Sequence, residues 1–244
     1  MEVRKYLMLI VEDRPSDSPY VERVWRAHSA GCGSFLSVAE YRSELVVTRH
    51  EDRVTVTLRG PETMVTRLSY PAATEWQGIR LKPGAFLPSL PTAELVNGGV
   101  TLPNATNASF WLDGSAWGVP DYDNADTFVA WLVRGGLLVI DPTVPAALRD
   151  EPTDASLRTI QRRFLQATGV TRSAARQIER ARYAALLLKR GESIADATHE
   201  AGYFDQPHLT RSVKRLIGQT PAELLNDRSE ELSFLYKTEP LGKP

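Results

Sequence analysis

Two short segments near the carboxyl end of the chain carry side chains that could recognise a polar partner. They contain Arg158, Gln161, Arg162 and Arg163 in the first segment, and Gln206, His208, Thr210, Arg211 and Lys214 in the second. A guanidinium or ammonium group can hold a guanine edge, and a carboxamide an adenine edge, through paired hydrogen bonds. The same basic groups also bind phosphate oxygens. The residue types favour contact with nucleic acid, although any single arginine here could equally be a solvent-exposed surface charge.

The basic residues are concentrated around these two segments. The whole chain has 29 Lys and Arg against 30 Asp and Glu, for a formal net charge of -1. Between residues 155 and 220 the counts are 12 and 5, a local net charge of about +7. Local basic density governs affinity for nucleic acid, because each phosphate contact releases condensed counterions. A solvated helical surface is the alternative interpretation.

Helix start and stop signals predict the elements that would hold the first segment. Ser156 is suited to cap a helix over residues 157–167, because its hydroxyl can accept a hydrogen bond from an unpaired backbone N–H. Gly169 predicts the end of that helix in a left-handed conformation. A long helix is expected over residues 173–189, with Arg182 as a phosphate contact or surface charge.

A second pair of helices is predicted around the second segment. Ser193 begins a helix that Gly202 ends, and Asp205 caps a helix that extends to Gly218. A capping box starting at Thr220 opens one last helix. Two short helices joined by a tight glycine-containing turn form a helix-turn-helix, whose second helix fits a major groove about 12 Å wide.

Residues 156–225 resemble the DNA-binding domain of AraC/XylS-type transcription regulators, in which a long helix bridges two helix-turn-helix units. The matching motifs are Ser156, Arg158, Ile160, Arg162 and Phe164; Gly202-Tyr203 with Leu209-Thr210-Arg211; and Gly218 to Pro221. The resemblance implies base-facing residues at Arg158, Gln161, Arg162, Gln206, His208 and Arg211. Arg163 and Lys214 are expected to contact phosphates or to be surface charges.

The first unit departs from that family pattern. A full helix and turn normally precede the first recognition helix, but here only residues 144–149 and 150–155 are available, and Pro152 interrupts them. We expect an abbreviated first unit, which makes the second unit the stronger candidate for base recognition.

The first half of the chain has the patterns of short strands. Val54, Val56 and Leu58 alternate with threonines, which predicts a half-buried strand. Further strands are expected over residues 45–48, 77–82 and 6–11, the last as a buried first strand. Short strands separated by Gly and Pro predict a β-rich barrel or sandwich before the helices, and an α+β chain overall. The family resemblance implies a cupin-like domain that binds a small effector or mediates dimerisation.

The segment between these parts has helical and aromatic character. A helix is expected to start after Asn124 and to break in two at Gly135-Gly136, and Pro142 and Pro145 start a short helix through Leu148. Trp111, Trp117 and Tyr122 are candidates for lining a ligand pocket. Packing in a core or a domain interface is the alternative, and is the more common role of aromatic residues.

Enzyme, metal and membrane functions find little support in the sequence. The four histidines lack metal-ligand spacing, and the chain has no nucleophile elbow, P-loop or dinucleotide-binding fingerprint. The single cysteine, Cys32, excludes an internal disulfide. We therefore expect a non-enzymatic cytoplasmic protein with no cofactor, no metal, no signal peptide and no membrane span.

These observations predict four parts: a β-rich effector or dimerisation domain (1–123), a helical linker (124–154), an AraC-type DNA-binding domain (155–225) and a tail (226–244). The expected function is sequence-specific DNA-binding transcription regulation, controlled by a small effector. Double-stranded DNA is the expected partner, and the family adds RNA polymerase and a second copy of the chain as candidates. The alternative is a ligand- or protein-binding β domain beside a degenerate helix-turn-helix domain with weak or no DNA binding.

Overall fold

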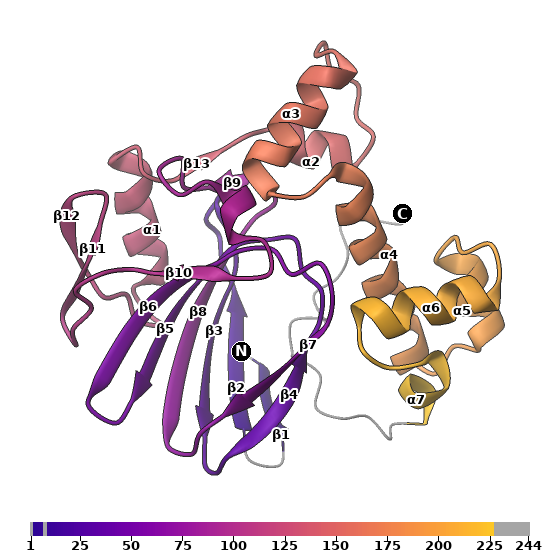
Figure 1. The fold of residues 1–244 in the computed structure, drawn as a ribbon, viewed down its shortest axis with the longest axis horizontal. Coiled ribbons are helices and arrows are strands. Elements are labelled where there is room, and N and C mark those ends of the chain that lie inside the picture. The colour runs from indigo at the N-terminus through magenta and orange to yellow at the C-terminus, as the bar shows by residue number, and fades with distance from the viewer. Residues whose placement is uncertain (1, 7–8, 227–244) are drawn as a thin grey trace.

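A seven-stranded antiparallel sheet occupies the first half of the chain in the computed structural model, which describes residues 2–6 and 9–226 (Figure 1). Its strands, in spatial order, are β1 (Glu2–Tyr6), β2 (Leu9–Pro15), β3 (Val21–Ser29), β8 (Thr74–Leu81), β5 (Glu44–His50), β6 (Arg53–Arg59) and β10 (Gly99–Thr101). The strands predicted over 45–48, 54–58 and 77–82 are confirmed. The single strand predicted over 6–11 is wrong, because β1 ends at Tyr6 and β2 begins at Leu9.

Both faces of this sheet are covered, and residues of the central strands alternate between two cores. On β5, Leu45 and Val47 join one apolar cluster, whereas Val46 joins the other. The first cluster includes Phe128 of α1 (Ala125–Arg134) and Phe110 of β11 (Ser109–Leu112), which pairs with β12 (Ser115–Gly118). The opposite face meets the two-stranded ribbon of β4 (Gly33–Ser37) and β7 (Thr66–Tyr70).

Helix α1 is shorter than the sequence pattern predicts. It ends at Arg134, and Gly136 adopts a positive φ of 72°, which breaks the helix as expected. The predicted continuation beyond the glycines is wrong. The chain instead forms β13 (Val139–Ile140), which pairs with β9 (Ala85–Phe86).

Six further helices lie between residues 143 and 225. They are α2 (Thr143–Leu148), α3 (Leu157–Thr168), α4 (Arg172–Lys189), α5 (Ile194–Glu200), α6 (Gln206–Leu216) and α7 (Pro221–Leu225). The predicted caps are confirmed: Ser156 accepts a hydrogen bond from the Thr159 N–H, Asp205 from the His208 N–H, and Thr220 and Glu223 complete a capping box. Gly169 ends α3 with a φ of 71°. The α+β class is confirmed.

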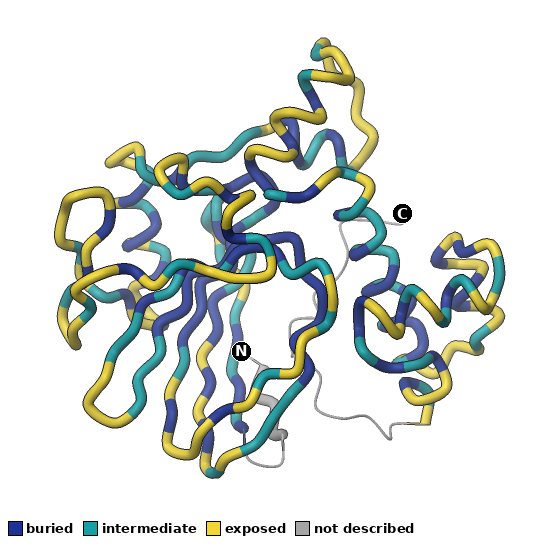
Figure 2. Tube along the Cα trace, in the orientation of Figure 1, coloured by how far each residue is buried: buried dark blue, intermediate teal, exposed yellow. Residues whose placement is uncertain are grey.

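The β-rich and helical regions share one apolar core. Leu36 of β4, and Ala39 and Tyr41 from the segment between β4 and β5, are buried in the same cluster as Phe164 of α3 and Leu209 of α6. Figure 2 shows buried stretches of α4, which lies between the sheet and the group of α5, α6 and α7. No helix in the described ranges has the length and apolar character that a membrane crossing requires.

A short 3-10 helix, Thr92–Leu95, packs against the carboxyl end of α3. Gly169 packs so closely on the Thr92 backbone that a Cβ at this position would overlap it. The end of the first predicted recognition helix therefore rests on the β-rich region.

Candidate nucleic-acid interface

The first set of predicted recognition residues lies on the exposed face of α3. Arg158, Gln161 and Arg162 are exposed, whereas Ile160 and Phe164 of the same helix are buried. The helical repeat separates the two sets, since residues three and four apart share a face. Within the described part of the chain, none of the three exposed side chains has a hydrogen-bond or ion-pair partner. Their donors and acceptors are available to an external partner.

Helix α6 presents the second set in a similar way. Gln206 and Arg211 are exposed, and their side chains have no partner among the described residues. His208 is half-buried, with its ring 5.1 Å from the ring of Tyr203 at an interplanar angle of 87°. Thr210 Oγ1 donates to the carbonyl of Gln206 at 2.8 Å, within the helix. Gln206 and Arg211 are thus the polar side chains of α6 that are most available to an external partner.

Two of the three predicted phosphate contacts, Arg163 and Lys214, have partners within the chain. Arg163 Nη1 donates to Thr143 Oγ1 of α2 at 3.3 Å. Lys214 Nζ lies 3.3 Å from Glu223 Oε2, and both side chains are about half exposed. An exposed ion pair of this kind contributes little stability and exchanges readily for a phosphate.

The prediction that Arg182 is a surface charge or phosphate contact is wrong. Arg182 is only 2 % exposed, and its Nη1 lies 2.9 Å from Glu40 Oε2 and 3.3 Å from the Ala39 carbonyl oxygen. A buried charge needs a partner to offset its lost hydration. Glu40, which supplies that partner, comes from the β-rich region far along the sequence.

The first helix-turn-helix unit is abbreviated, as the sequence suggests. Helix α2 has six residues, and the chain from Arg149 to Ser156 separates it from α3. Arg172 and Arg176, at the start of α4, both form ion pairs with Asp150 in this connection. These ion pairs hold the segment between α2 and α3 against the start of α4.

The comparisons with known proteins agree with this geometry. Residues 152–227 match the family model of a helix-turn-helix domain. This part of the chain is therefore a helix-turn-helix domain, with α3 and α6 as the second helices of its two units. The match supports a DNA-binding domain of the AraC type, which occurs in transcription regulators. No curated protein and no solved structure gives a significant match to the chain.

The β-rich region contacts the carboxyl end of α6 directly. The Ala39 N–H donates to the Leu216 carbonyl oxygen at 2.8 Å, and the Val65 N–H donates to the Arg215 carbonyl oxygen at 3.1 Å. The last carbonyl groups of a helix have no partner within the helix. Two loops of the β-rich region thus cap the recognition helix of the second unit.

A buried cluster of charges surrounds this contact. Glu40 Oε1 accepts from Arg42 Nη1 at 2.8 Å, and Arg42 Nη2 lies 2.8 Å from Glu179 Oε1 of α4. Glu40 Oε2 lies 3.3 Å from Arg80 Nη1. Burial alone would raise the pKa of Glu40, but the guanidinium groups of Arg182, Arg42 and Arg80 outweigh it and hold the pKa well below its ordinary value. Glu40 is a carboxylate shared by the sheet and α4.

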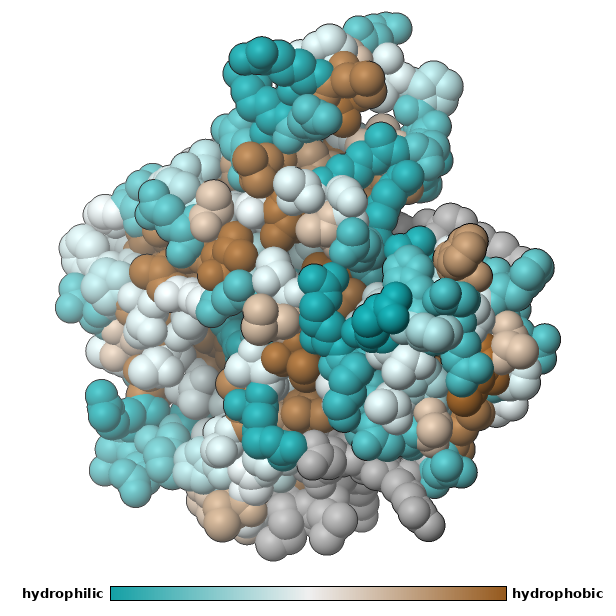
Figure 3. All heavy atoms as spheres, turned by 45° about the vertical axis from the view of Figure 1, so that its right-hand side comes forward, coloured by the Kyte–Doolittle hydropathy of each residue, from teal (hydrophilic) through white to brown (hydrophobic). Residues whose placement is uncertain are grey.

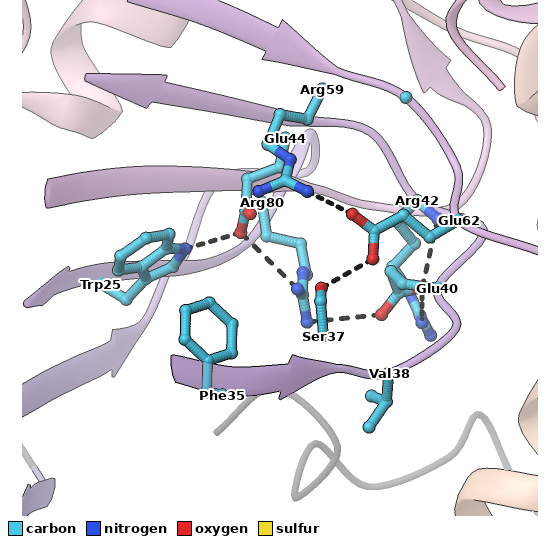
Figure 4. A pocket seen from close by; sticks show the side chains of 11 residues that line it. Trp25, Phe35, Ser37, Val38, Glu40, Arg42, Glu44, Arg59, Glu62 and Arg80 are labelled. Carbon is cyan, nitrogen blue, oxygen red and sulfur yellow. Dashed lines mark hydrogen bonds and ion pairs between the residues drawn. The ribbon is translucent and has the colours of Figure 1, made fainter. Parts of the chain in front are cut away.

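A small pocket lies beside Glu40, between the sheet and β4 (Figure 4). Its volume is about 70 Å³. It is lined by Trp25, Phe35, Ser37, Val38, Glu40, Arg42, Glu44, Arg59, Gly60, Glu62 and Arg80. Three carboxylates and three guanidinium groups therefore balance in charge around it.

One wall of the pocket depends on a glycine in the sheet. Trp25 Nε1 donates to Glu44 Oε1 at 2.6 Å, across the strand that carries Gly78. A Cβ at Gly78 would overlap the Trp25 indole. A glycine inside a strand pattern can mark such a close approach, and Gly78 is the signal from which the sequence could have located this pocket.

Arg80 is the least satisfied charged group in the pocket. It is 2 % exposed, and its Nη2 lies 3.6 Å from Glu44 Oε1. Its Nε and Nη1 have no hydrogen-bond partner among the described residues. Burial raises the pKa of Glu44, while Arg80 and the Trp25 hydrogen bond oppose that rise.

The three aromatic residues predicted as ligand contacts lie away from this pocket. Trp111 is 43 % exposed on β11, and the Trp117 ring packs edge-on against Phe128 at 6.4 Å. Tyr122 is buried beneath the guanidinium of Arg26, which lies 4.7 Å from its ring. Trp117 and Tyr122 pack against the apolar core of the sheet.

Proposed function

We propose that the protein is a sequence-specific transcription regulator that places α3 and α6 in the major groove of double-stranded DNA. The observation that supports this most directly is the set of exposed, uncommitted side chains on the two helices: Arg158, Gln161, Arg162, Gln206 and Arg211. Arginine and glutamine are the side chains that read guanine and adenine through two hydrogen bonds. The β-rich region packs on other faces and leaves these residues exposed.

Selection of genomic fragments by the full-length chain tests this proposal. A regulator enriches a defined sequence, and its affinity for that sequence falls steeply as salt is raised, because phosphate contacts release counterions. A chain that enriches no sequence overturns the proposal. It would favour the alternative of a ligand- or protein-binding β domain beside a degenerate DNA-binding domain.

We further propose that the pocket beside Glu40 holds the effector. The balanced charges of its lining favour a small neutral or zwitterionic molecule whose groups both donate and accept hydrogen bonds. Arg80 would supply donors from its Nε and Nη1, which lack hydrogen-bond partners among the described residues, Glu44 would accept, and Trp25 and Phe35 would cover apolar atoms. Buried polar groups without partners are costly, so a ligand that satisfies Arg80 gains affinity from this site.

The same segment that walls the pocket would carry the signal to α6. Ser37, Glu40 and Arg42 face the pocket. Ala39, between them, caps α6, and Glu40 pairs with Arg182 of α4. A ligand that draws Arg80 away from Glu40 would shift this segment and, with it, the end of the recognition helix. Binding at the two sites would then be coupled in free energy.

Thermal-shift screening of small neutral and zwitterionic compounds, followed by amide hydrogen exchange, tests this coupling. A ligand should raise the melting temperature and change exchange at residues 213–218 of the parent chain. The Ser37→Phe variant, which fills the pocket, should lose the shift. A ligand whose effects persist in Ser37→Phe binds elsewhere and contradicts the assignment.

A further inference from the structure

The two most exposed large apolar side chains among the described residues lie at the starts of the two recognition helices. Phe204 is 92 % exposed and directly precedes Asp205, the N-cap of α6. Leu157 is 74 % exposed and is the first residue of α3. The next most exposed large apolar residue, Met64, reaches only 52 %. The same feature thus appears at equivalent ends of two helices.

Phe204 packs on little of the part of the chain that the structure describes. An apolar residue directly before an N-cap commonly packs on the fourth helical residue, here Leu209. Leu209 is fully buried without help from Phe204, which stays almost wholly in solvent. The adjacent Tyr203 fills the core position instead, and its hydroxyl donates to Ser212 Oγ at 2.9 Å. Phe204 is therefore available to a partner outside the described residues.

The chemistry around both residues favours DNA as that partner. Leu157 is next to Arg158, and Phe204 is two residues before Gln206, and both polar side chains are exposed. In helix-turn-helix proteins the N-terminal residues of the recognition helix contact base edges. The apolar group that the major groove offers is the C5-methyl of thymine. Figure 3 shows a hydrophobic patch among hydrophilic residues at the protruding end where α3 begins.

We propose that Phe204 and Leu157 each contact a thymine methyl group, so that each recognition helix selects a thymine beside its polar contacts. This inference rests on the proposed DNA-binding function. It goes beyond that function by adding an apolar specificity determinant to each helix-turn-helix unit. The two thymines should lie about one helical turn, or ~10 base pairs, apart.

Deoxyuridine, which is thymine without the methyl group, is the probe. In a duplex selected by the full-length chain, each thymine is replaced singly by deoxyuridine and the dissociation constant is measured. Burial of one methyl group corresponds to about a fourfold change in affinity. Two positions about a turn apart should show that loss. A scan in which no position loses affinity overturns the inference while the selected sequence still supports the proposed function.

Variants then assign each thymine to its residue. Phe204→Ser should abolish the deoxyuridine penalty at one position and keep it at the other, and Leu157→Ser should do the reverse. Phe204→Leu should retain the penalty, and Trp131→Ser, an exposed apolar residue on α1, should retain both. Penalties that survive Phe204→Ser and Leu157→Ser overturn the inference. A parent chain that selects no sequence overturns both this inference and the proposed function.

Discussion

The backbone N–H of Ala39 donates a hydrogen bond to the carbonyl oxygen of Leu216, with 2.8 Å between nitrogen and oxygen. Ala39 belongs to the segment that walls the pocket, and Leu216 is the last residue of α6. One hydrogen bond thus connects the β-rich region to the helix that carries Gln206 and Arg211. The buried charges next to Ala39 hold this connection in place, and they can be tested separately.

Glu40→Gln should destabilise the chain strongly. Glu40 faces the buried guanidinium groups of Arg42, Arg80 and Arg182, and a neutral amide removes the one carboxylate that pairs with all three. Loss of one partner from a buried ion pair costs about 3–5 kcal/mol. Urea unfolding at neutral pH measures the loss. The control is Glu151→Gln, which removes an exposed pair with Arg149 and should leave stability unchanged. Equal effects of the two substitutions would refute the importance of the cluster.

Glu44→Gln should change the pH dependence of stability. Burial raises the pKa of Glu44 above its ordinary value of 4.5, so the folded chain holds its proton to a higher pH than the unfolded chain does. The contribution of Glu44 to the free energy of unfolding therefore falls as pH rises from about 4.5 through the raised folded pKa. The amide keeps an acceptor for Trp25 and removes this titration. Unfolding free energies of both chains at several pH values from 4 to 7 should show the variant gaining on the parent as pH rises. A constant difference would contradict the prediction.

Gly78→Ala should disrupt the pocket. The added Cβ would overlap the Trp25 indole, which must move and release Glu44. Overpacking of this kind costs about 1–3 kcal/mol. Urea unfolding and tryptophan fluorescence report the change. Gly118→Ala is the matched control, because its Cβ would meet nothing closer than the Ala108 carbonyl oxygen at 4.0 Å. A Gly78→Ala chain as stable as this control would show that the close packing is unimportant.

Arg211→Ala should weaken DNA binding in a sequence-dependent way. Its side chain is exposed and uncommitted, so a base contact is its proposed role. Loss of a two-bond contact costs about 1–3 kcal/mol and relaxes the preference at one base pair. Lys214→Ala provides the comparison: it should weaken binding to all sequences alike and lower the salt slope by about one. If Arg211→Ala behaves like Lys214→Ala, Arg211 contacts phosphate rather than a base.

Local signals were enough to predict the helical region. Ser156, Asp205 and Thr220 each cap a helix through contacts within three residues, so the sequence around them contains the whole interaction. The 3.6-residue repeat likewise places Arg158 and Gln161 on the exposed face of α3. The roles of these side chains on DNA stay predictions.

Long-range partners explain what the sequence did not predict. Arg182 contacts the Ala39 carbonyl across 143 residues of chain, and no local pattern reveals such a partner. The pocket has the same origin, because Trp25, Glu44 and Arg80 meet only when β3, β5 and β8 pair. The break after α1 was predicted, but the strand that follows it depends on pairing with β9.

The capping of α6 by Ala39 and Val65 has a practical consequence for dissecting this protein. A fragment that starts at residue 152 would retain every base-facing candidate but lose both donors to the Arg215 and Leu216 carbonyl oxygens. It would also expose Arg182 and Gly218, which Glu40 and Leu36 now cover. In the isolated fragment the carboxyl end of α6 would fray, and apolar side chains that now contact the β-rich region would be exposed to solvent. A DNA affinity measured on this fragment would therefore be lower than that of the intact chain.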